Sequence, residues 1–489
     1  MHLISIFRKD GIVSLLRIRH INHFLVCLSF AVFIGVGCAH YPVNRPIEQP
    51  DPASGYRGKF MATPEKSDQM LVYVTFSGGG TRAAAFSYGV LEALRDIEVT
   101  AGGRKRRLLD EIDAISSVSG GSFTAAYYGL FGDRIFEDFE TKFLKKNIQG
   151  AVFRRTFLNP VNWARLFSPY FDRSDLAAEY YDKHVFEKST FSDIAESKGP
   201  MILINATDMI TGIRLPFTQD LFDVICSDIS DFPVARATAA SSAVPILLTP
   251  ITLRNYANSC GFRMPEELDK ILKEQDVTKR QFHHINNLRP YLDAERNRYI
   301  HLVDGGVADN LGVRAALDRV LALGDVWKTL KYTRHENVRQ VIFIIVNAET
   351  AISREWQLFG KPPPFGAMLQ SYSSIAITRY NFETVMLLRE NFARWTDEIQ
   401  KNRCGSAPIN TEPGACGDIE FYLIEVKFDA LKDEDERTYF KSLPTSFKLA
   451  SEEVDKLREV ARQLLRESEE FQRLLGDLEA EERPQRSAP

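Results

Sequence analysis

A serine between a predicted strand and a predicted helix is the first residue whose context suits chemistry. Ser119 lies in the sequence SVSGG, residues 117–121, directly after an apolar strand expected over 112–118. The pattern resembles the nucleophile elbow G-x-S-x-G, whose sharp turn exposes a serine hydroxyl at the N-terminus of a helix. Ser117 stands where that motif has its first glycine. A plain strand–helix turn gives the same pattern, so this stretch alone makes Ser119 only a candidate nucleophile.

Three consecutive glycines form the second candidate site. Gly78, Gly79 and Gly80 follow an apolar strand expected over 71–76 and precede a helix expected over 82–97. Without side chains in the way, their backbone N–H groups can converge on the oxyanion of an acyl-transfer reaction. Arg82 could steady this loop or bind a negatively charged part of a substrate.

The same glycine loop also fits a dinucleotide-binding fingerprint. Gly78-x-Gly80-x-x-Ala83 joins a strand to a helix, as that fingerprint requires. A dinucleotide site also needs an acidic residue about 20 positions on, at the end of the next strand. Glu98 has this spacing but lies at the end of the predicted helix. On the loop alone, both alternatives stay open.

A carboxylate is the best candidate for the base that a hydroxyl nucleophile needs. Asp304 follows a strand expected over 300–303 and precedes two glycines, so we expect it at the same carboxyl edge of the sheet as the other motifs. An ordinary aspartate has a pKa of ~3.9, and burial would raise that pKa toward a useful value. Asp208, which follows another strand, is the competing carboxylate, and we expect it to shape a turn instead.

Histidine, the usual base, has weaker support in this sequence. His301 would point to the opposite face of its strand from Asp304, because side chains alternate along a strand. His283 and His284 lie in a polar insertion with no motif beside them. A carboxylate that acts directly on serine is the simpler interpretation.

Together these motifs resemble the signature of patatin-like phospholipases. GGGTR at 78–82, a serine elbow about forty residues on, and DGGVADNLG at 304–312 carry the likeness, with NATD at 205–208 and AASSAVP at 239–245 similar to bacterial members. The resemblance extends from about residue 71 to 475. It implies an α/β fold and cleavage of acyl esters of phospholipids or related lipids through an acyl-enzyme, with no metal and no cofactor.

Carried over by position, the resemblance makes Ser119 the nucleophile and Asp304 its base. The three glycines of the loop would supply the N–H groups of the oxyanion hole, with Arg82 beside them. Two alternatives remain: a catalytically silent lipid-binding scaffold of the same fold, and a dinucleotide-binding oxidoreductase.

The order of strands and helices predicts a three-layer α/β/α sandwich with a mostly parallel central sheet. Short apolar strands alternate with helices, and residues 341–346 are almost wholly apolar, as in a sheet covered on both faces. We expect one acyl hydrolase domain over 69–480, with a polar insertion at about 254–298 and a disordered tail over 481–489. An amphipathic helix over 451–475 is expected to pack on the core.

The N-terminal segment has the features of an export signal. Basic residues precede an apolar run over 24–37, which is shorter than the roughly 20 residues that a membrane span needs. The sequence GVGC resembles a bacterial lipobox, so residues 1–37 would be a signal peptide and Cys38 the lipidated residue; an uncleaved signal anchor is the alternative. We expect a protein exported and tethered to a membrane surface by the proline-rich segment 38–68, with Ala39 favouring the outer membrane of a two-membrane bacterium.

The remaining cysteines fit an oxidising compartment. Cys404 and Cys416 flank a loop rich in glycine and proline, which favours a disulfide between them. Pairing of Cys226 with Cys260 is the weaker alternative. No CxxC pattern or nearby histidine pair supports zinc.

Composition excludes little except nucleic acid as a partner. The chain has 489 residues, of which 44% are hydrophobic, so a large core is available. Its formal net charge is only -4, and no extended basic field would attract nucleic acid.

Overall fold

The computed structural model describes residues 39–482, apart from 102–103, 245–247, 352–354, 359 and 405–417. The predicted signal peptide 1–37, Cys38, Cys416 and residues 483–489 of the predicted tail lie outside this description. Lipidation of Cys38 and a disulfide between Cys404 and Cys416 therefore stay predictions.

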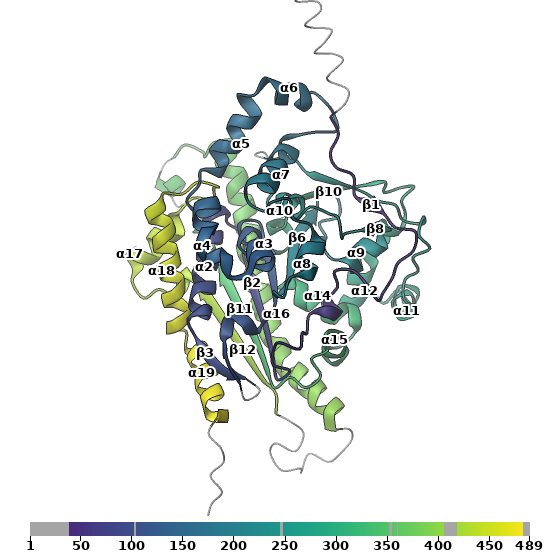
Figure 1. The fold of residues 1–489 in the computed structure, drawn as a ribbon, viewed down its shortest axis with the longest axis vertical. Coiled ribbons are helices and arrows are strands. Elements are labelled where there is room, and N and C mark those ends of the chain that lie inside the picture. Colours follow the sequence, from purple (N-terminus) through teal and green to yellow (C-terminus); the bar gives the residue numbers. More distant parts are fainter. Residues whose placement is uncertain are drawn as a thin grey trace, which may run out of the picture.

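A mostly parallel sheet occupies the centre of the molecule (Figure 1). Within the described residues its strands lie in the order β12–β11–β2–β5–β6–β10–β9, and β7 also pairs with β6. The strands from β12 to β6 run parallel, whereas β7, β9 and β10 run antiparallel to their neighbours. The bounds are β2 Met70–Phe76, β5 Ile112–Val118, β6 Met201–Asp208, β7 Arg214–Pro216, β9 Ile251–Arg254, β10 Tyr299–Asp304, β11 Gln340–Asn347 and β12 Glu420–Lys427.

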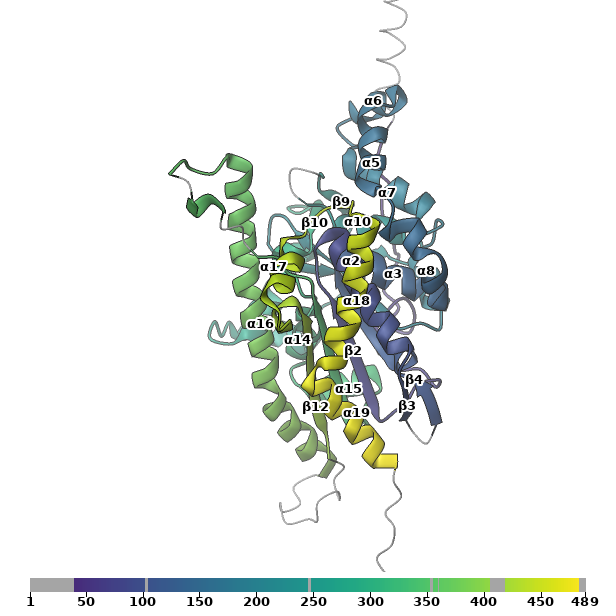
Figure 2. The same cartoon turned by 90° about the vertical axis from the view of Figure 1, so that its left-hand side faces the viewer.

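Helices cover both faces of this sheet, which explains its apolar strands. Every residue of β2 and β5 is buried. Figure 2 shows α2, α3 and α18 on one face and the long α16 on the other. This arrangement confirms the predicted α/β/α sandwich. The bounds of these helices, and of α14 and α15 beside α16, are α2 Gly80–Arg95, α3 Gly120–Phe131, α14 Arg314–Leu323, α15 Val326–Thr333, α16 Phe365–Cys404 and α18 Ser451–Glu467.

Further helices surround the sandwich. They include α4 Ile135–Phe139, α5 Ile148–Phe157, α6 Pro160–Leu166, α7 Arg173–His184, α8 Phe191–Glu196, α9 Gln219–Val224, α10 Val234–Ser241, α13 Gly306–Asp309, α17 Glu434–Ser442 and α19 Glu469–Glu482. The predicted polar insertion contains α11 Glu266–Glu274 and α12 Arg280–Asn286. Outside the main sheet, β1 Arg45–Pro46 pairs with β8 Ser227–Asp228, and β3 Glu98–Ala101 pairs with β4 Arg104–Arg107.

The amphipathic C-terminal helix packs on the core, as its pattern predicts. Val454, Leu457 and Val460 on α18 are buried against the layer that holds α2. The helical segment is longer than expected, because α19 continues after a break at Ser468.

The segment predicted to be a tether instead packs against the domain over much of its length. Strand β1 pairs with β8, and Asn44 is buried. The Asn44 side chain donates a hydrogen bond to the carbonyl of Arg254 and accepts one from its N–H. Arg57 is buried in ion pairs with two aspartates. Residues 41–61 of the predicted tether 38–68 therefore lie on the domain, because their polar groups find partners there.

Cys226 and Cys260 form a disulfide. It joins the segment after α9 to the beginning of the polar insertion. The weaker of the two predicted pairings is thus confirmed.

The strand that carries Asp304 runs opposite to the expected direction. β10 pairs antiparallel with β6, with Asp304 opposite Ala206. β5 pairs parallel with β6, with Val118 opposite Asn205. Ser119 directly follows Val118. Ser119 and Asp304 therefore lie at the same height along β6, although β5 and β10 approach that height from opposite directions. An apolar run before Asp-Gly-Gly predicts a strand but carries no information about its direction.

Candidate active site

Ser119 occupies a strained turn between β5 and α3. Its φ is 50° and its ψ is -119°, a sparsely populated conformation for a residue with a side chain. Such strain costs about 1–3 kcal/mol and is found mainly at functional sites. Only glycine fits directly after it, because a Cβ on Gly120 would lie 2.0 Å from the carbonyl oxygen of Gly80. A Cβ on Gly121 would lie 2.7 Å from the Ser77 oxygen.

Ser241 holds this turn in place from the end of α10. The backbone N–H of Ser119 donates to Ser241 Oγ at 2.9 Å, and Ser241 Oγ donates to the carbonyl of Asn205 at 2.6 Å. The hydroxyl therefore bridges the elbow to β6. Sequence reasoning missed this role, although Ser241 lies in the AASSAVP stretch that contributed to the resemblance.

The side chains of Ser119 and Asp304 are hydrogen-bonded to each other. Ser119 Oγ donates to Asp304 Oδ2 at 2.8 Å, and the two residues are 4% and 8% exposed. The second carboxylate oxygen, Asp304 Oδ1, accepts from the N–H of Gly306 at 2.8 Å. Burial raises the pKa of Asp304 to about 6, and the two hydrogen bonds oppose that rise. A hydroxyl thus faces a buried carboxylate that is mostly ionised near neutral pH.

The glycine loop lies against this pair. A Cβ on Gly78 would lie 3.3 Å from the Cβ of Ser119 and 2.5 Å from Asn310 Oδ1. The N–H of Gly78 already donates to the carbonyl of Asn310 at 3.0 Å. Within the described part of the chain, the N–H groups of Gly79 and Gly80 have no such partner. The structure therefore narrows the expected oxyanion donors from three glycines to these two.

Positive φ angles explain why the loop needs glycine. Gly79 has φ 141° and Gly80 has φ 60°, conformations that side chains disfavour. A Cβ on Gly80 would also lie 2.5 Å from the carbonyl of Ser446. Helix α2 begins at Gly80, so free N–H groups are expected at this position.

Arg82 fastens the glycine loop to segments far away in the sequence. Its guanidinium donates to the carbonyls of Ala348 and Leu443 and to the hydroxyl of Thr445. Burial lowers the pKa of Arg82 to about 10. Of the two roles expected for Arg82, the structure supports the steadying one, because these three acceptors occupy the guanidinium.

The other candidate bases lie in structural contacts. His301 Nδ1 is 3.0 Å from Thr252 Oγ1, and His283 Nε2 is 2.7 Å from the carbonyl of Val277. Asp208 accepts from the N–H of Ile210, which confirms its role in the turn after β6. In the described structure the hydroxyl of Ser119 meets a carboxylate and no imidazole.

The geometry does not support a dinucleotide site at the glycine loop. Glu98 begins β3, in a hairpin outside the main sheet. The strand after α2 in the parallel sheet is β5, which ends at Val118 and is followed by Ser119 instead of an acid. The ribose-binding carboxylate of the fingerprint therefore has no counterpart here.

Ser117 fits the position where the elbow motif has glycine. It is fully buried, and its hydroxyl donates to the carbonyl of Leu203 on β6 at 3.2 Å. The small side chain points into the sheet and finds a partner, so the departure from the motif leaves the turn intact.

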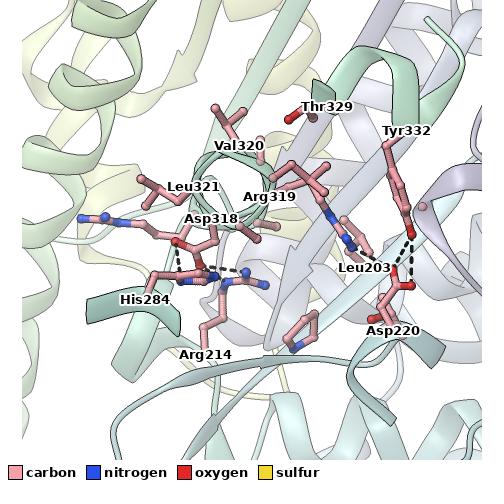
Figure 3. A pocket seen from close by; sticks show the side chains of 18 of the residues that line it. Leu203, Arg214, Asp220, His284, Asp318, Arg319, Val320, Leu321, Thr329 and Tyr332 are labelled. Atoms are coloured by element: carbon pink, nitrogen blue, oxygen red, sulfur yellow. Dashed lines mark hydrogen bonds and ion pairs between the residues drawn. The ribbon is translucent and has the colours of Figure 1, made fainter. Parts of the chain in front are cut away.

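A cavity of about 880 Å³ lies on the α14 side of the sheet, and its lining contains neither Ser119 nor Asp304. Figure 3 shows contacts between charged and polar groups of its lining: Arg214 pairs with Asp318, Arg319 pairs with Asp220, and His284 Nδ1 lies 4.0 Å from Asp318. These two arginine–aspartate pairs neutralise part of the charge in the lining, and apolar side chains from the sheet and from α14 line much of the rest.

Comparison with known proteins assigns the region that contains this geometry to a family. The family model described as patatin-like phospholipase matches residues 74–317, which include both Ser119 and Asp304. No curated protein gives a significant match. The family match supports lipid acyl hydrolase activity.

Solved structures of a human enzyme are similar at low identity. Human GIVD cytosolic phospholipase A2 has 13% identity and a TM-score of 0.42, with 84% of this chain and 63% of that chain covered. The same enzyme in complex with methyl gamma-linolenyl fluorophosphonate has 12% identity and a TM-score of 0.39, with 84% and 59% covered. The chain thus spans less than two thirds of the length of these proteins.

Proposed function

Residues 74–317 form a patatin-like phospholipase domain, and we propose that it cleaves acyl esters of membrane phospholipids or related lipids with Ser119 as nucleophile and Asp304 as base. The observation that carries the proposal is the 2.8 Å hydrogen bond from Ser119 Oγ to the buried Asp304 Oδ2. The strained elbow presents the hydroxyl, and the raised pKa of Asp304 suits a general base.

The reaction would proceed in two steps. Ser119 Oγ attacks the ester carbonyl carbon while its proton moves to Asp304 Oδ2; the carbon–oxygen bond to the alcohol then breaks, and the alcohol takes this proton. In the second step, water attacks the acyl-enzyme and gives its proton to Asp304. The fatty acid leaves, and the proton returns to Ser119 Oγ.

The N–H groups of Gly79 and Gly80 are the proposed donors to the oxyanion. They lie at the N-terminus of α2, where the helix dipole also favours negative charge. Gly80 contacts Gly120, so the loop and the elbow approach each other closely. Loss of one such donor typically lowers the rate about 10²–10³-fold.

We also propose export and anchoring at Cys38. The lipobox-like sequence motivates this, and the disulfide between Cys226 and Cys260 supports an oxidising compartment. Among the described residues, no helix is long and apolar enough to span a membrane. Attachment would raise the local concentration of lipid substrate.

The test is release of fatty acid from phospholipid vesicles and from a short soluble ester. Ser119→Ala and Asp304→Asn are each expected to lower the rate by about 10³-fold or more. Ser87→Ala is the matched serine control, because Ser87 Oγ is buried on α2 without a hydrogen bond among the described residues. Asp208→Asn is the matched carboxylate control. Activity that survives in Ser119→Ala would identify another nucleophile, and loss of activity in Asp208→Asn but not in Asp304→Asn would identify another base.

A further inference from the structure

Helices α5 and α6 expose an unusual group of large apolar side chains. The pair projects from one end of the molecule, beyond α7 (Figures 1 and 2). Side chains this apolar are usually buried, and a contiguous exposed group marks an interaction surface. Six of them are between 48% and 71% exposed: Phe153, Phe157, Leu158, Val161, Trp163 and Phe167.

The same segment is basic. Residues 148–171 include three arginines and no aspartate or glutamate. Arg154 and Arg155, in the last turn of α5, form no ion pair with any described residue. Arg155 also lies over the ring of Tyr180, 5.8 Å from its centroid. Aromatic side chains next to cations without a carboxylate partner among the described residues fit the interface of a bilayer that contains anionic phospholipid.

The exposed surface is a built structure. Asn147 and Asn159 cap α5 and α6 with their side chains. Trp163 Nε1 donates to the carbonyl of Phe157 at 3.1 Å, and buried Asn162 donates to that of Arg155. These bonds hold the two helices together while their large apolar side chains stay exposed.

The chain enters the described structure beside this surface. The carbonyl of Ala39 accepts a hydrogen bond from Ser168 Oγ at 2.5 Å. The rings of His40 and Tyr170 stack with centroids 5.1 Å apart, and the N–H of Tyr41 donates to the carbonyl of Tyr170. Ala39 directly follows Cys38 and the apolar run at 24–37. A membrane attachment at that point would thus lie one residue from the α5–α6 surface.

We propose that the α5–α6 surface docks on a phospholipid bilayer, with Trp163 and its apolar neighbours among the acyl chains near the headgroups. This inference rests on the proposed membrane attachment and is independent of the proposed hydrolysis. Lipid fits the surface better than a second copy of the chain, because the nearby membrane attachment and the two arginines without a carboxylate partner among the described residues both match an anionic bilayer.

The docking surface would also orient the active site. α5 contacts α7, α7 contacts α10, and α10 carries Ser241 beside the elbow. Helix α2 leads from the glycine loop to β3, which lies at the end of the molecule opposite to α5 and α6 (Figure 1). The glycine loop therefore lies toward the docked end of the molecule.

The test uses the full chain reconstituted in vesicles of equal amounts of phosphatidylcholine and phosphatidylglycerol. A Ser119→Ala background avoids consumption of the lipid. Phospholipids brominated on the acyl chains are expected to quench the fluorescence of Trp163, and aqueous iodide is not. The sequence has four tryptophans, so the signal of Trp163 is obtained as the difference from Trp163→Phe.

Two matched variants isolate the surface from the attachment at Cys38. Val161→Asp places a charge on the surface at a valine that is 69% exposed. Aspartate is well tolerated there, because the residue lies in the first turn of α6. Val277→Asp makes the same change at a valine that is 64% exposed, between α11 and α12. We expect Val161→Asp to lose most of the bromine quenching and Val277→Asp to keep it.

Three results would overturn the docking proposal. The first is full access of iodide to Trp163 on vesicles. The second is equal quenching of Trp163 by brominated lipid in Val161→Asp and Val277→Asp. The third is shielding of Trp163 from iodide without lipid that increases with protein concentration, which would indicate a second copy of the chain. Hydrolysis of a soluble ester, with Ser119 restored, is expected to be unchanged in both variants. An enzyme without activity would contradict the proposed function and leave the quenching result valid.

Discussion

Replacement of Asp304 by asparagine is expected to abolish hydrolysis and to stabilise the fold at neutral pH. In the folded protein, burial raises the pKa of Asp304 to about 6 from an ordinary value near 3.8. The folded state therefore holds this proton more tightly than the unfolded chain does. Ionisation of the buried carboxylate lowers the free energy of unfolding as the pH rises from about 4 to about 6.

The magnitude follows from the difference between the two pKa values. About two pH units correspond to roughly 3 kcal/mol of stability that the wild type loses above pH 6. Asparagine has no charge to desolvate. Its oxygen can accept from the N–H of Gly306, and its amide can donate to Ser119 Oγ, so both hydrogen bonds of the site have replacements. The variant is expected to be more stable than the wild type at pH 8 by up to about 3 kcal/mol and nearly equal to it at pH 4.

Urea denaturation of both proteins at several pH values measures this difference directly. All other titrating groups are shared, so the difference between the two proteins isolates Asp304. A difference that does not change between pH 4 and pH 8 would refute the raised pKa. A less stable variant at pH 8 would show that the ionised carboxylate stabilises the fold.

Three more predictions concern the same site and its surroundings. The value of kcat/KM for a soluble ester is expected to rise with pH and reach half its maximum near pH 6, because Asp304 must lose its proton to act as a base; a profile that is flat between pH 5 and pH 8 would contradict this. Ser241→Ala leaves the buried N–H of Ser119 without its acceptor, so we expect a loss of about 1–3 kcal/mol in urea denaturation together with a lower kcat; unchanged stability and rate would exclude the bridging role. Replacement of Cys226 and Cys260 by serine removes a cross-link between residues 34 positions apart, which is expected to lower the free energy of unfolding by about 4 kcal/mol. Reduction of the disulfide in the wild type is expected to lower the free energy of unfolding by the same amount.

The local parts of the site could be read from the sequence. Glycines next to Ser119 predict a tight turn, and apolar runs before Asp304 and before the glycine loop predict buried strands. These signals are local, since they depend on backbone freedom and side-chain alternation over a few residues. The structure confirms the sandwich and brings the two side chains into contact.

The details that the sequence did not predict depend on partners far away in the sequence. The occupied N–H of Gly78 depends on Asn310, and the orientation of Arg82 depends on carbonyls at 348 and 443. The segment 38–68 was predicted to be a tether because it is rich in proline, whereas strand pairing with β8 fixes part of it on the domain. No sequence pattern indicates which residues far apart in the chain form these contacts.

The direction of β10 shows how such distant contacts determine the site. The antiparallel course brings Asp304 to the level of Ala206 and sends the following loop back across the elbow. That loop supplies the N–H of Gly306 to the carboxylate and the carbonyl of Asn310 to Gly78. One reversed strand therefore positions the base and the glycine loop together, and a change that disturbs the loop over 305–312 is expected to affect both.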